Sequence, residues 1–242
     1  MQSPDLLKGR EVLLAGGSGG IGSVIAEQLL AEGARLVISY RANRDRAARW
    51  EGVAKVIQAD LADSADRTRL VDAAPHLYGL VVFTGDPARV PDPSQVEPAM
   101  HRSHAINYLG PILLAREAAQ RMQASAIAGA IILISTMQAN ALFPGSTVYA
   151  AQKAALQHAA LILAKESRGP ANIRVNVVSP GIIAAGMAEA SIASGRYDRF
   201  IQDGAIPRFG RAIDVARAVR LFLEPDNYVT GQVLCVDGGI TL

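Results

Sequence analysis

The chain has 242 residues, and half of them are apolar, which is enough to build a substantial hydrophobic core. Its 24 Lys and Arg residues nearly balance its 22 Asp and Glu residues, and arginine is spread along the chain, so nucleic-acid binding is not expected. The single cysteine, Cys235, excludes an internal disulfide framework and a cysteine zinc cluster. No apolar run approaches the roughly 18 residues of a membrane helix. We therefore expect a soluble, cytoplasmic protein with no membrane partner.

Short apolar and β-branched runs alternate with longer segments of helical period. The predicted strands are residues 11–15, 35–40, 55–59, 79–83, 129–135, 174–178 and 232–236. The predicted helices are residues 21–32, 65–73, 99–123, 147–167 and 214–223. Several strands are apolar at consecutive positions, which indicates a parallel sheet buried on both faces. The pattern predicts an α/β fold, a doubly wound Rossmann-type parallel sheet of about seven strands, with residues 1–242 forming a single dinucleotide-binding and catalytic domain.

Residues 182–210 interrupt this alternation and are long for a connection in a compact domain. The segment contains glycines that permit backbone rearrangement and apolar side chains that are costly to leave in water. These residues are Gly186, Gly195, Gly204, Met187, Tyr197 and Phe200. We expect a substrate lid that orders over bound ligands, and the alternative is a rigid pair of short helices.

A glycine-rich turn links the first predicted strand to the first predicted helix. Glycines let a phosphate approach the backbone, and the start of a helix directs free N–H groups and a favourable dipole at it. This strand–turn–helix context predicts a dinucleotide site, with an unliganded turn as the alternative. The candidate cofactor residues in the turn are Gly16, Ser18, Gly20, Ile21 and Gly22.

The end of the second predicted strand indicates which dinucleotide binds. An NAD site usually places a carboxylate there to accept from the ribose 2′-hydroxyl. This chain instead has Arg41, and also Arg44, which suit a 2′-phosphate, with Ser39 as a further donor. NADP(H) is therefore favoured over NAD(H), unless these arginines are ordinary surface charge.

Tyr149 and Lys153 stand four residues apart on the predicted helix at 147–167, so their side chains share one face. An unperturbed tyrosine has a pKa of about 10. A neighbouring ammonium and an oxidised nicotinamide both favour the phenolate, so we expect the pKa of Tyr149 to be lowered. Such a pair suits proton exchange with an alcohol oxygen while a hydride moves to or from carbon. A surface pair is the alternative.

Further motifs extend along the chain: Asp60-Leu61, Asn107, Pro180-Gly181, Tyr228-Val229-Thr230-Gly231-Gln232 and Val236-Asp237-Gly238-Gly239. With the glycine turn and the Tyr149-x-x-x-Lys153 pair, they make the chain resemble the short-chain dehydrogenase/reductase family, in its compact single-domain branch. The resemblance implies that Tyr149 is the acid/base and that Lys153 also holds the nicotinamide ribose. It further implies cofactor contacts from Asp60, Leu61, Gly85, Pro180, Gly181 and Ile183.

The resemblance also implies a hydroxyl thirteen residues before the tyrosine, and that position is Thr136. Ser135 lies one residue too early, and one residue along a strand reverses the face. For Asn107, whose helix kink supports a water in the family, the sequence adds its own argument. Pro111 has no N–H to bond the carbonyl of Asn107, so that carbonyl is freed if residues 99–123 form one helix. A simple kink is the alternative.

The sequence departs from the family pattern at two cofactor positions. The motif Asn-Asn-Ala-Gly is replaced by residues 82–85, which keep only Gly85, and the carboxamide-binding threonine is replaced by Ala185. These changes put cofactor affinity in doubt more than catalysis.

We interpret the chain as an NADP(H)-dependent oxidoreductase that acts on a small carbonyl or secondary-alcohol substrate, with Asn107, Thr136, Tyr149 and Lys153 as the catalytic set. The alternative is a dinucleotide-binding regulatory or scaffold protein on the same fold. We expect no metal site, and a homo-oligomer that is a tetramer or a dimer. We also expect a largely apolar substrate pocket, lined by Leu142, Phe143, Met187, Tyr197 and Phe200.

Overall fold

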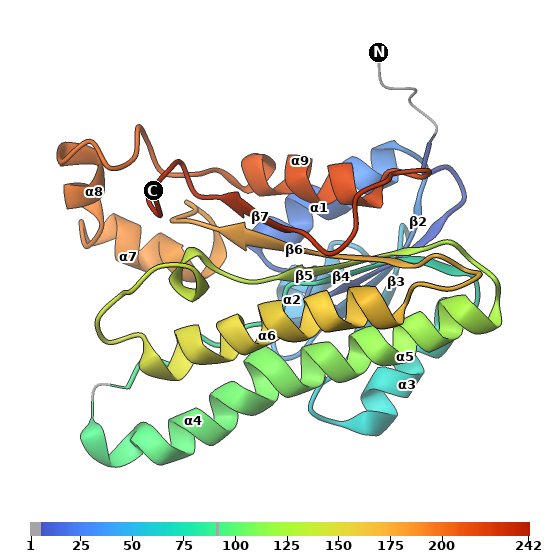
Figure 1. The fold of residues 1–242 in the computed structure, drawn as a ribbon, viewed down its shortest axis with the longest axis horizontal. Coiled ribbons are helices and arrows are strands. Elements are labelled where there is room, and N and C mark those ends of the chain that lie inside the picture. The colour runs from blue at the N-terminus through green and yellow to red at the C-terminus, as the bar shows by residue number, and fades with distance from the viewer. Residues whose placement is uncertain (1–5, 91) are drawn as a thin grey trace.

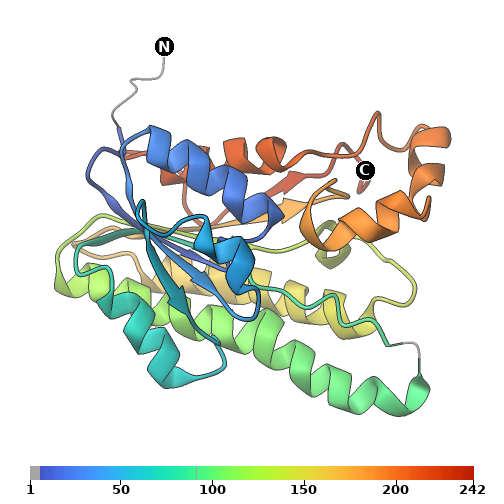
Figure 2. The same ribbon diagram turned by 180° about the vertical axis from the view of Figure 1, so that it is seen from behind.

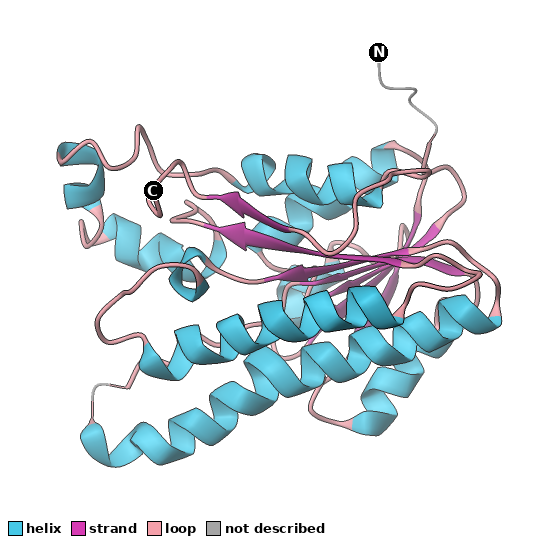
Figure 3. Cartoon of the chain, in the orientation of Figure 1, coloured by secondary structure: helices cyan, strands magenta, loops and turns pink. Residues whose placement is uncertain are grey.

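The computed structural model describes residues 6–90 and 92–242 and contains one parallel sheet of seven strands, in the order β3-β2-β1-β4-β5-β6-β7. The strands are β1 (Glu11–Ala15), β2 (Arg35–Tyr40), β3 (Lys55–Gln58), β4 (Leu77–Val82), β5 (Ala130–Ile134), β6 (Arg174–Pro180) and β7 (Val233–Val236). All seven coincide with predicted runs to within a few residues. The doubly wound, single-domain α/β fold is confirmed, and helices cover both faces of the sheet (Figures 1 and 3).

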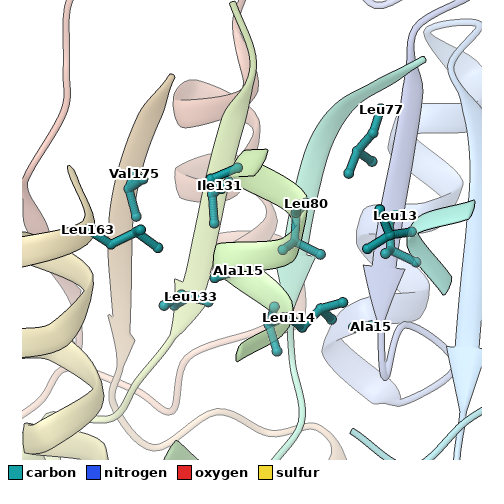
Figure 4. Close-up of a cluster of buried hydrophobic side chains, with 14 of the residues drawn as sticks. Leu13, Ala15, Leu77, Leu80, Leu114, Ala115, Ile131, Leu133, Leu163 and Val175 are labelled. Atoms are coloured by element: carbon teal, nitrogen blue, oxygen red, sulfur yellow. The ribbon is translucent and has the colours of Figure 1, made fainter. Parts of the chain in front are cut away.

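Successive strand residues face opposite cores, which explains why the strands are apolar at every position. Leu13 and Leu80 belong to the core beneath the long helices, whereas Val12 and Val81 belong to the core on the other face. Figure 4 shows the first core, where Leu114 from a covering helix meets the side chains of β1, β4 and β5. Both cores bury nearly all of their aliphatic side chains, so the central strands are held from two sides.

The helices are divided between the two faces (Figures 1 and 2). One face carries α1 (Gly20–Ala31) and α9 (Ala212–Leu223), which pack against each other. The opposite face carries α3 (Ser64–Asp72), α4 (Val96–His104), α5 (Gly110–Ala124) and α6 (Thr147–Glu166). A short helix, α2 (Arg44–Ala48), was not predicted, because five residues are too few for a periodic pattern.

The predicted single helix at residues 99–123 is interrupted by a π-helical turn, η2 (Ala105–Leu109), between α4 and α5. Pro111 has no N–H with which to bond the carbonyl of Asn107, and the wider turn absorbs the missing hydrogen bond. The disruption expected from the sequence is therefore present, and Asn107 lies within it.

Residues 182–210 form η4 (Gly186–Ala188), α7 (Glu189–Ala193) and α8 (Asp198–Gln202), placed where β6 and β7 point in Figure 1. The two ends of this insertion are joined, since Ala184 N donates to Gly210 O at 2.7 Å and Gly210 N donates to Ile182 O at 2.9 Å. Tyr197 and Phe200 pack on a small third core and are not left in water. The lid motion stays a prediction. Because the two ends of the insertion are joined, such a motion would involve only the residues between them.

Within the described part of the chain, no helix combines the length and the apolar character needed to cross a lipid bilayer.

A stability prediction follows from the contact between the ends of β6 and β7. A Cβ on Gly181 would lie 2.6 Å from the Cα of Asp237, whereas a Cβ on Gly169 would have open space, and neither glycine has a positive φ. We expect Gly181→Ala to lower the free energy of unfolding by about 1–3 kcal/mol, because backbone must shift to relieve the overlap. The matched Gly169→Ala change should stay within about 0.5 kcal/mol in urea denaturation. Equal effects would contradict this packing.

Candidate active site

The glycine turn is built by two different constraints. Gly16 has a φ of +78°, a conformation that favours glycine, and its N–H donates to Ser39 Oγ at 3.0 Å. A Cβ on Gly22 would lie 2.7 Å from the Cα of Gly17, so α1 packs directly on the turn. The N-cap residue Gly19 has no side chain to cap the helix, which leaves the first N–H groups of α1 available to a ligand.

A cavity of about 210 Å³ opens over this turn at the carboxyl edge of the sheet. It gathers most of the predicted cofactor residues from four separate segments of the chain. Those lining it are Gly16, Gly20, Ile21, Gly22, Gly85, Tyr149, Pro180, Gly181 and Ile183. Ser18 does not line the cavity, although it belongs to the same turn. The N–H groups and the absence of side chains on the turn fit the pyrophosphate of a dinucleotide.

Arg41 and Asp60 lie in a separate hollow at the ends of β2 and β3. The backbone of Arg41 is held there by Gln58, whose Nε2 donates to Arg41 O at 2.9 Å. Arg44 forms an ion pair with Glu51 at 3.5 Å, so its charge is already matched. Arg41 is therefore the cation at this strand end that fits a 2′-phosphate best.

Two predicted residues near this hollow, Ser39 and Leu61, make contacts within the protein that support the fold. Ser39 is buried, and its Oγ accepts from Gly16, so it supports the glycine turn rather than reaching towards a phosphate. The Leu61 side chain lies in the core, and its carbonyl accepts from Arg67 Nη1 at 2.7 Å.

A second and larger cavity, of about 520 Å³, adjoins the first. The residues common to both walls are Thr136, Tyr149, Gly181, Met187 and Ala188. Phe143, Tyr197 and Phe200 line the larger cavity as predicted, but Leu142 is 99 % exposed and does not. The expectation of a largely apolar pocket is wrong, because three arginines, Arg89, Arg196 and Arg199, also line it.

Tyr149, on α6, forms a side-chain hydrogen bond with Thr136 at the end of β5. Burial, the largest cause, and the nearby charge of Asp86 together raise the pKa of Tyr149 to about 12, against the opposing effect of the hydrogen bond with Thr136. The groups of the protein around Tyr149 therefore raise its pKa, contrary to the expectation of a lowered value. Tyr149 keeps its proton at neutral pH, which is the form that donates.

Lys153 lies one turn further along α6 and is 3 % exposed. Its Nζ donates to the carbonyl of Ile134, the last residue of β5, at 2.9 Å and to the carbonyl of Thr84, just beyond β4, at 3.2 Å. Burial lowers the pKa of Lys153 to about 7, so its charge changes near neutral pH.

The neighbouring hydroxyls of Thr136 and Ser135 have different partners. Ser135 Oγ donates to the carbonyl of Lys153 at 3.2 Å and accepts from Gln157 Nε2 at 3.1 Å, so it braces α6. Thr136 instead bonds Tyr149 and lines both cavities. The one-residue register decides which hydroxyl meets the site.

Asn107 lies in the π-helical turn, and its side-chain amide holds the backbone of Asp86 through hydrogen bonds. Its Oδ1 accepts from Asp86 N at 3.0 Å, while its Nδ2 donates to Asp86 O at 2.9 Å and to Ser103 Oγ at 2.9 Å. Asp86 was not predicted to matter; its carboxylate pairs with Arg102 at 2.8 Å. Partial burial opposes the shift, but hydrogen bonds from Arg102 and Ala88 lower the pKa of Asp86. The only sequence signal was its position directly after Gly85.

Among residues 6–90 and 92–242, no group of three or more His, Cys, Asp or Glu side chains is arranged to hold a metal ion.

The comparisons with known proteins agree with this geometry. The model of the family described as enoyl-(acyl carrier protein) reductase matches residues 15–241. The chain belongs to the short-chain dehydrogenase/reductase family. An NADPH-dependent aldehyde reductase-like chloroplastic protein of Arabidopsis thaliana is 33 % identical over 98 % of this chain and 96 % of its own.

Solved structures of the short-chain dehydrogenase/reductase family superpose over nearly the whole chain. A member from Mycobacterium ulcerans has a TM-score of 0.87 at 28 % identity, covering 97 % of this chain and 90 % of its own. The NADP-bound structure of ElxO has a TM-score of 0.84 at 26 % identity, covering 96 % of this chain and 98 % of its own. The chain therefore has the fold of this oxidoreductase family over nearly its whole length.

Proposed function

We propose that this protein is an NADP(H)-dependent oxidoreductase that transfers a hydride between nicotinamide and the carbonyl or alcohol carbon of a small molecule. The observation that carries the proposal is the wall that the two adjacent cavities share. Tyr149 and Thr136 stand between a cavity floored by the glycine turn and a second cavity large enough for a small substrate. This position supports a role for Tyr149 as a proton donor at the boundary between a cofactor site and a substrate site.

Residues of this chain hold and orient the two reactants. The glycine turn and the start of α1 would bind the pyrophosphate, Arg41 the 2′-phosphate, and Lys153 the nicotinamide ribose. The nicotinamide, when bound, supplies or accepts the hydride. In reduction, the Tyr149 hydroxyl would give its proton to the carbonyl oxygen as the carbonyl carbon accepts that hydride, and a proton taken up from solvent would restore the Tyr149 hydroxyl. Thr136 hydrogen-bonds that oxygen and orients it.

The protonation state of Tyr149 is compatible with reduction. Tyr149 holds its proton at neutral pH, which is the form that can act as the acid towards a carbonyl oxygen. Asn107 keeps the Gly85–Asp86 backbone in place beside Lys153, and its own carbonyl lies in the π-helical turn where a relay water would bind. The NADPH-dependent Arabidopsis relative and NADP-bound ElxO support the same choice of cofactor.

The alternative function is a dinucleotide-binding regulator without turnover. It is motivated by Ala185, which lies against Gly20 at the cofactor cavity and offers a methyl group where the family has a hydrogen-bonding threonine. NADPH binding without oxidation by any carbonyl compound would favour this alternative.

The proposal predicts which hydroxyls matter for turnover. With NADPH absorbance as the readout over a panel of aldehydes and ketones, Tyr149→Phe should lower kcat by about 10²–10⁴-fold, because the proton donor is lost. Thr136→Ala should lower kcat by about 10²–10³-fold, because the carbonyl oxygen loses its hydrogen bond. Ser135→Ala is the matched control and should be mild, since that hydroxyl braces α6. A larger loss in Ser135→Ala would contradict the assignment.

Arg41 should set the preference for NADP(H). A charge-assisted contact to phosphate is worth about 1.5–3 kcal/mol, so Arg41→Ala should weaken NADPH binding by about 10–100-fold and leave NADH binding unchanged in calorimetry. Arg44→Ala is the control on the same loop and should have a smaller effect, because Arg44 is paired with Glu51. Tighter binding of NADH than NADPH by the unaltered protein would overturn this preference.

The titration of Lys153 predicts a pH dependence. The side chain is charged below its pKa of about 7 and neutral above it. The charged form binds the ribose hydroxyls better, so kcat/KM for NADPH should be constant below that pH and fall as pH rises through it. In Lys153→Arg the guanidinium stays charged, and the fall near neutrality should disappear. A wild-type profile that stays flat across neutral pH would contradict the prediction.

The assembly predicted from the sequence is also part of the proposal. Ile162 on α6 is 48 % exposed, and Leu242 at the C-terminus is fully exposed. Apolar side chains in these positions support a homo-oligomer, a tetramer or a dimer, with α6 and the last residues at its interfaces.

A further inference from the structure

Three arginines stand around the larger cavity, on the side away from the glycine turn. Arg89 comes from the segment between β4 and α4, Arg196 from the turn between α7 and α8, and Arg199 from α8. They line the same cavity as Tyr149 and Thr136 and do not line the smaller cavity over the glycine turn. They therefore belong to the substrate side of the shared wall.

The charges of these arginines are not neutralised within the protein. None of the three is within ion-pair distance of a carboxylate in the described part of the chain. Arg89 Nη2 donates to the neutral Ser191 Oγ at 2.8 Å, and Ser191 is buried, so this bond ties the Arg89 side chain to the insertion at the cavity wall. Arg196 and Arg199 lie near the rings of Tyr197 and Phe200. Each guanidinium keeps N–H donors for a ligand.

The acidic residues nearby do not supply the missing countercharge. No Asp or Glu among the described residues lines the cavity. Asp86 is paired with Arg102, and the Glu189 carboxylate accepts from Gly186 N at 2.9 Å. Cavities lined by one sign of charge concentrate ligands of the opposite sign and speed their association. Arginine also binds planar oxyanions with two parallel hydrogen bonds.

We propose that the substrate carries an anionic group, a carboxylate or a phosphate, in addition to its reacting carbonyl; this rests on the function proposed above. The carbonyl lies at Thr136 and Tyr149, and the anionic group lies among the arginines. Phe143 and Met187 contact the carbon skeleton between them. The anionic group is not altered in the reaction and serves to hold and orient the substrate.

The test compares matched aldehydes that differ in charge. The probes are para-carboxybenzaldehyde, para-formylphenyl phosphate and the neutral methyl para-formylbenzoate, with succinic semialdehyde and its methyl ester as a shorter pair. Binding to the NADP⁺-loaded protein is measured by calorimetry, and reduction is measured with NADPH. An anionic probe should bind at least tenfold more tightly than its ester and be reduced with a correspondingly higher kcat/KM. The carboxylate and phosphate arms show which oxyanion is preferred.

The variants separate the arginines from general charge effects. The double change Arg196→Gln and Arg199→Gln should remove most of the anion preference, measured as the ratio of kcat/KM for each acid to kcat/KM for its ester. Arg168 is an exposed arginine that lines neither cavity, so Arg168→Gln makes the same type of charge change and should preserve the preference.

The outcomes distinguish this inference from the proposed function. Equal binding and equal reduction of acids and esters would overturn the inference and leave the oxidoreductase proposal standing. Preferential binding of the acids without any reduction would support the anionic ligand and overturn the proposed turnover. Absence of binding by every probe would overturn the inference.

Discussion

The buried amine of Lys153 joins helix α6 to the carboxyl edge of the sheet. Its two acceptors are the carbonyls of Thr84, just beyond β4, and of Ile134, the last residue of the neighbouring strand β5, so a single side chain positions α6 against both strands. Tyr149 lies one helical turn before Lys153 on α6. Because Lys153 holds α6 against the sheet, the side chain of Tyr149 reaches Thr136 and forms a hydrogen bond with it. The same burial that fixes the geometry makes the lysine charge sensitive to pH and keeps the tyrosine protonated.

A second set of contacts supports this arrangement from the outer helices. Ser103 Oγ donates to the carbonyl of Val148, which ties α4 to the start of α6, and accepts from Asn107. Asn107 in turn grips the backbone of Asp86 just beyond β4. The π-helical turn created by Pro111 places Asn107 at the point where helix, strand end and Lys153 converge. A local irregularity in the helix thus serves the site.

The larger cavity beside these residues takes part of its charged lining from a segment outside the regular alternation of strands and helices. Residues 182–210 bring Arg196 and Arg199 over the carboxyl edge, and the contact of Arg89 with Ser191 joins them to the segment after β4. In the proposed function, the regular scaffold would supply the proton donor and the cofactor site, while the insertion would supply two of the groups that select the substrate. This division matches the way binding specificity is usually carried by loops above a rigid sheet.

The sequence by itself determined the seven strands, the glycine turn, the Tyr149–Lys153 pair and the disrupted helix at Asn107. Each depends on local periodicity, on glycine and proline chemistry, or on residues within a few positions of one another. Only the tertiary structure decided the partners of Asp86, the contact of the buried Ser39 hydroxyl with Gly16, the raised pKa of Tyr149 and the cluster of Arg89, Arg196 and Arg199. These features depend on burial and on contacts between segments far apart in the chain, and neither leaves a periodic trace in the sequence.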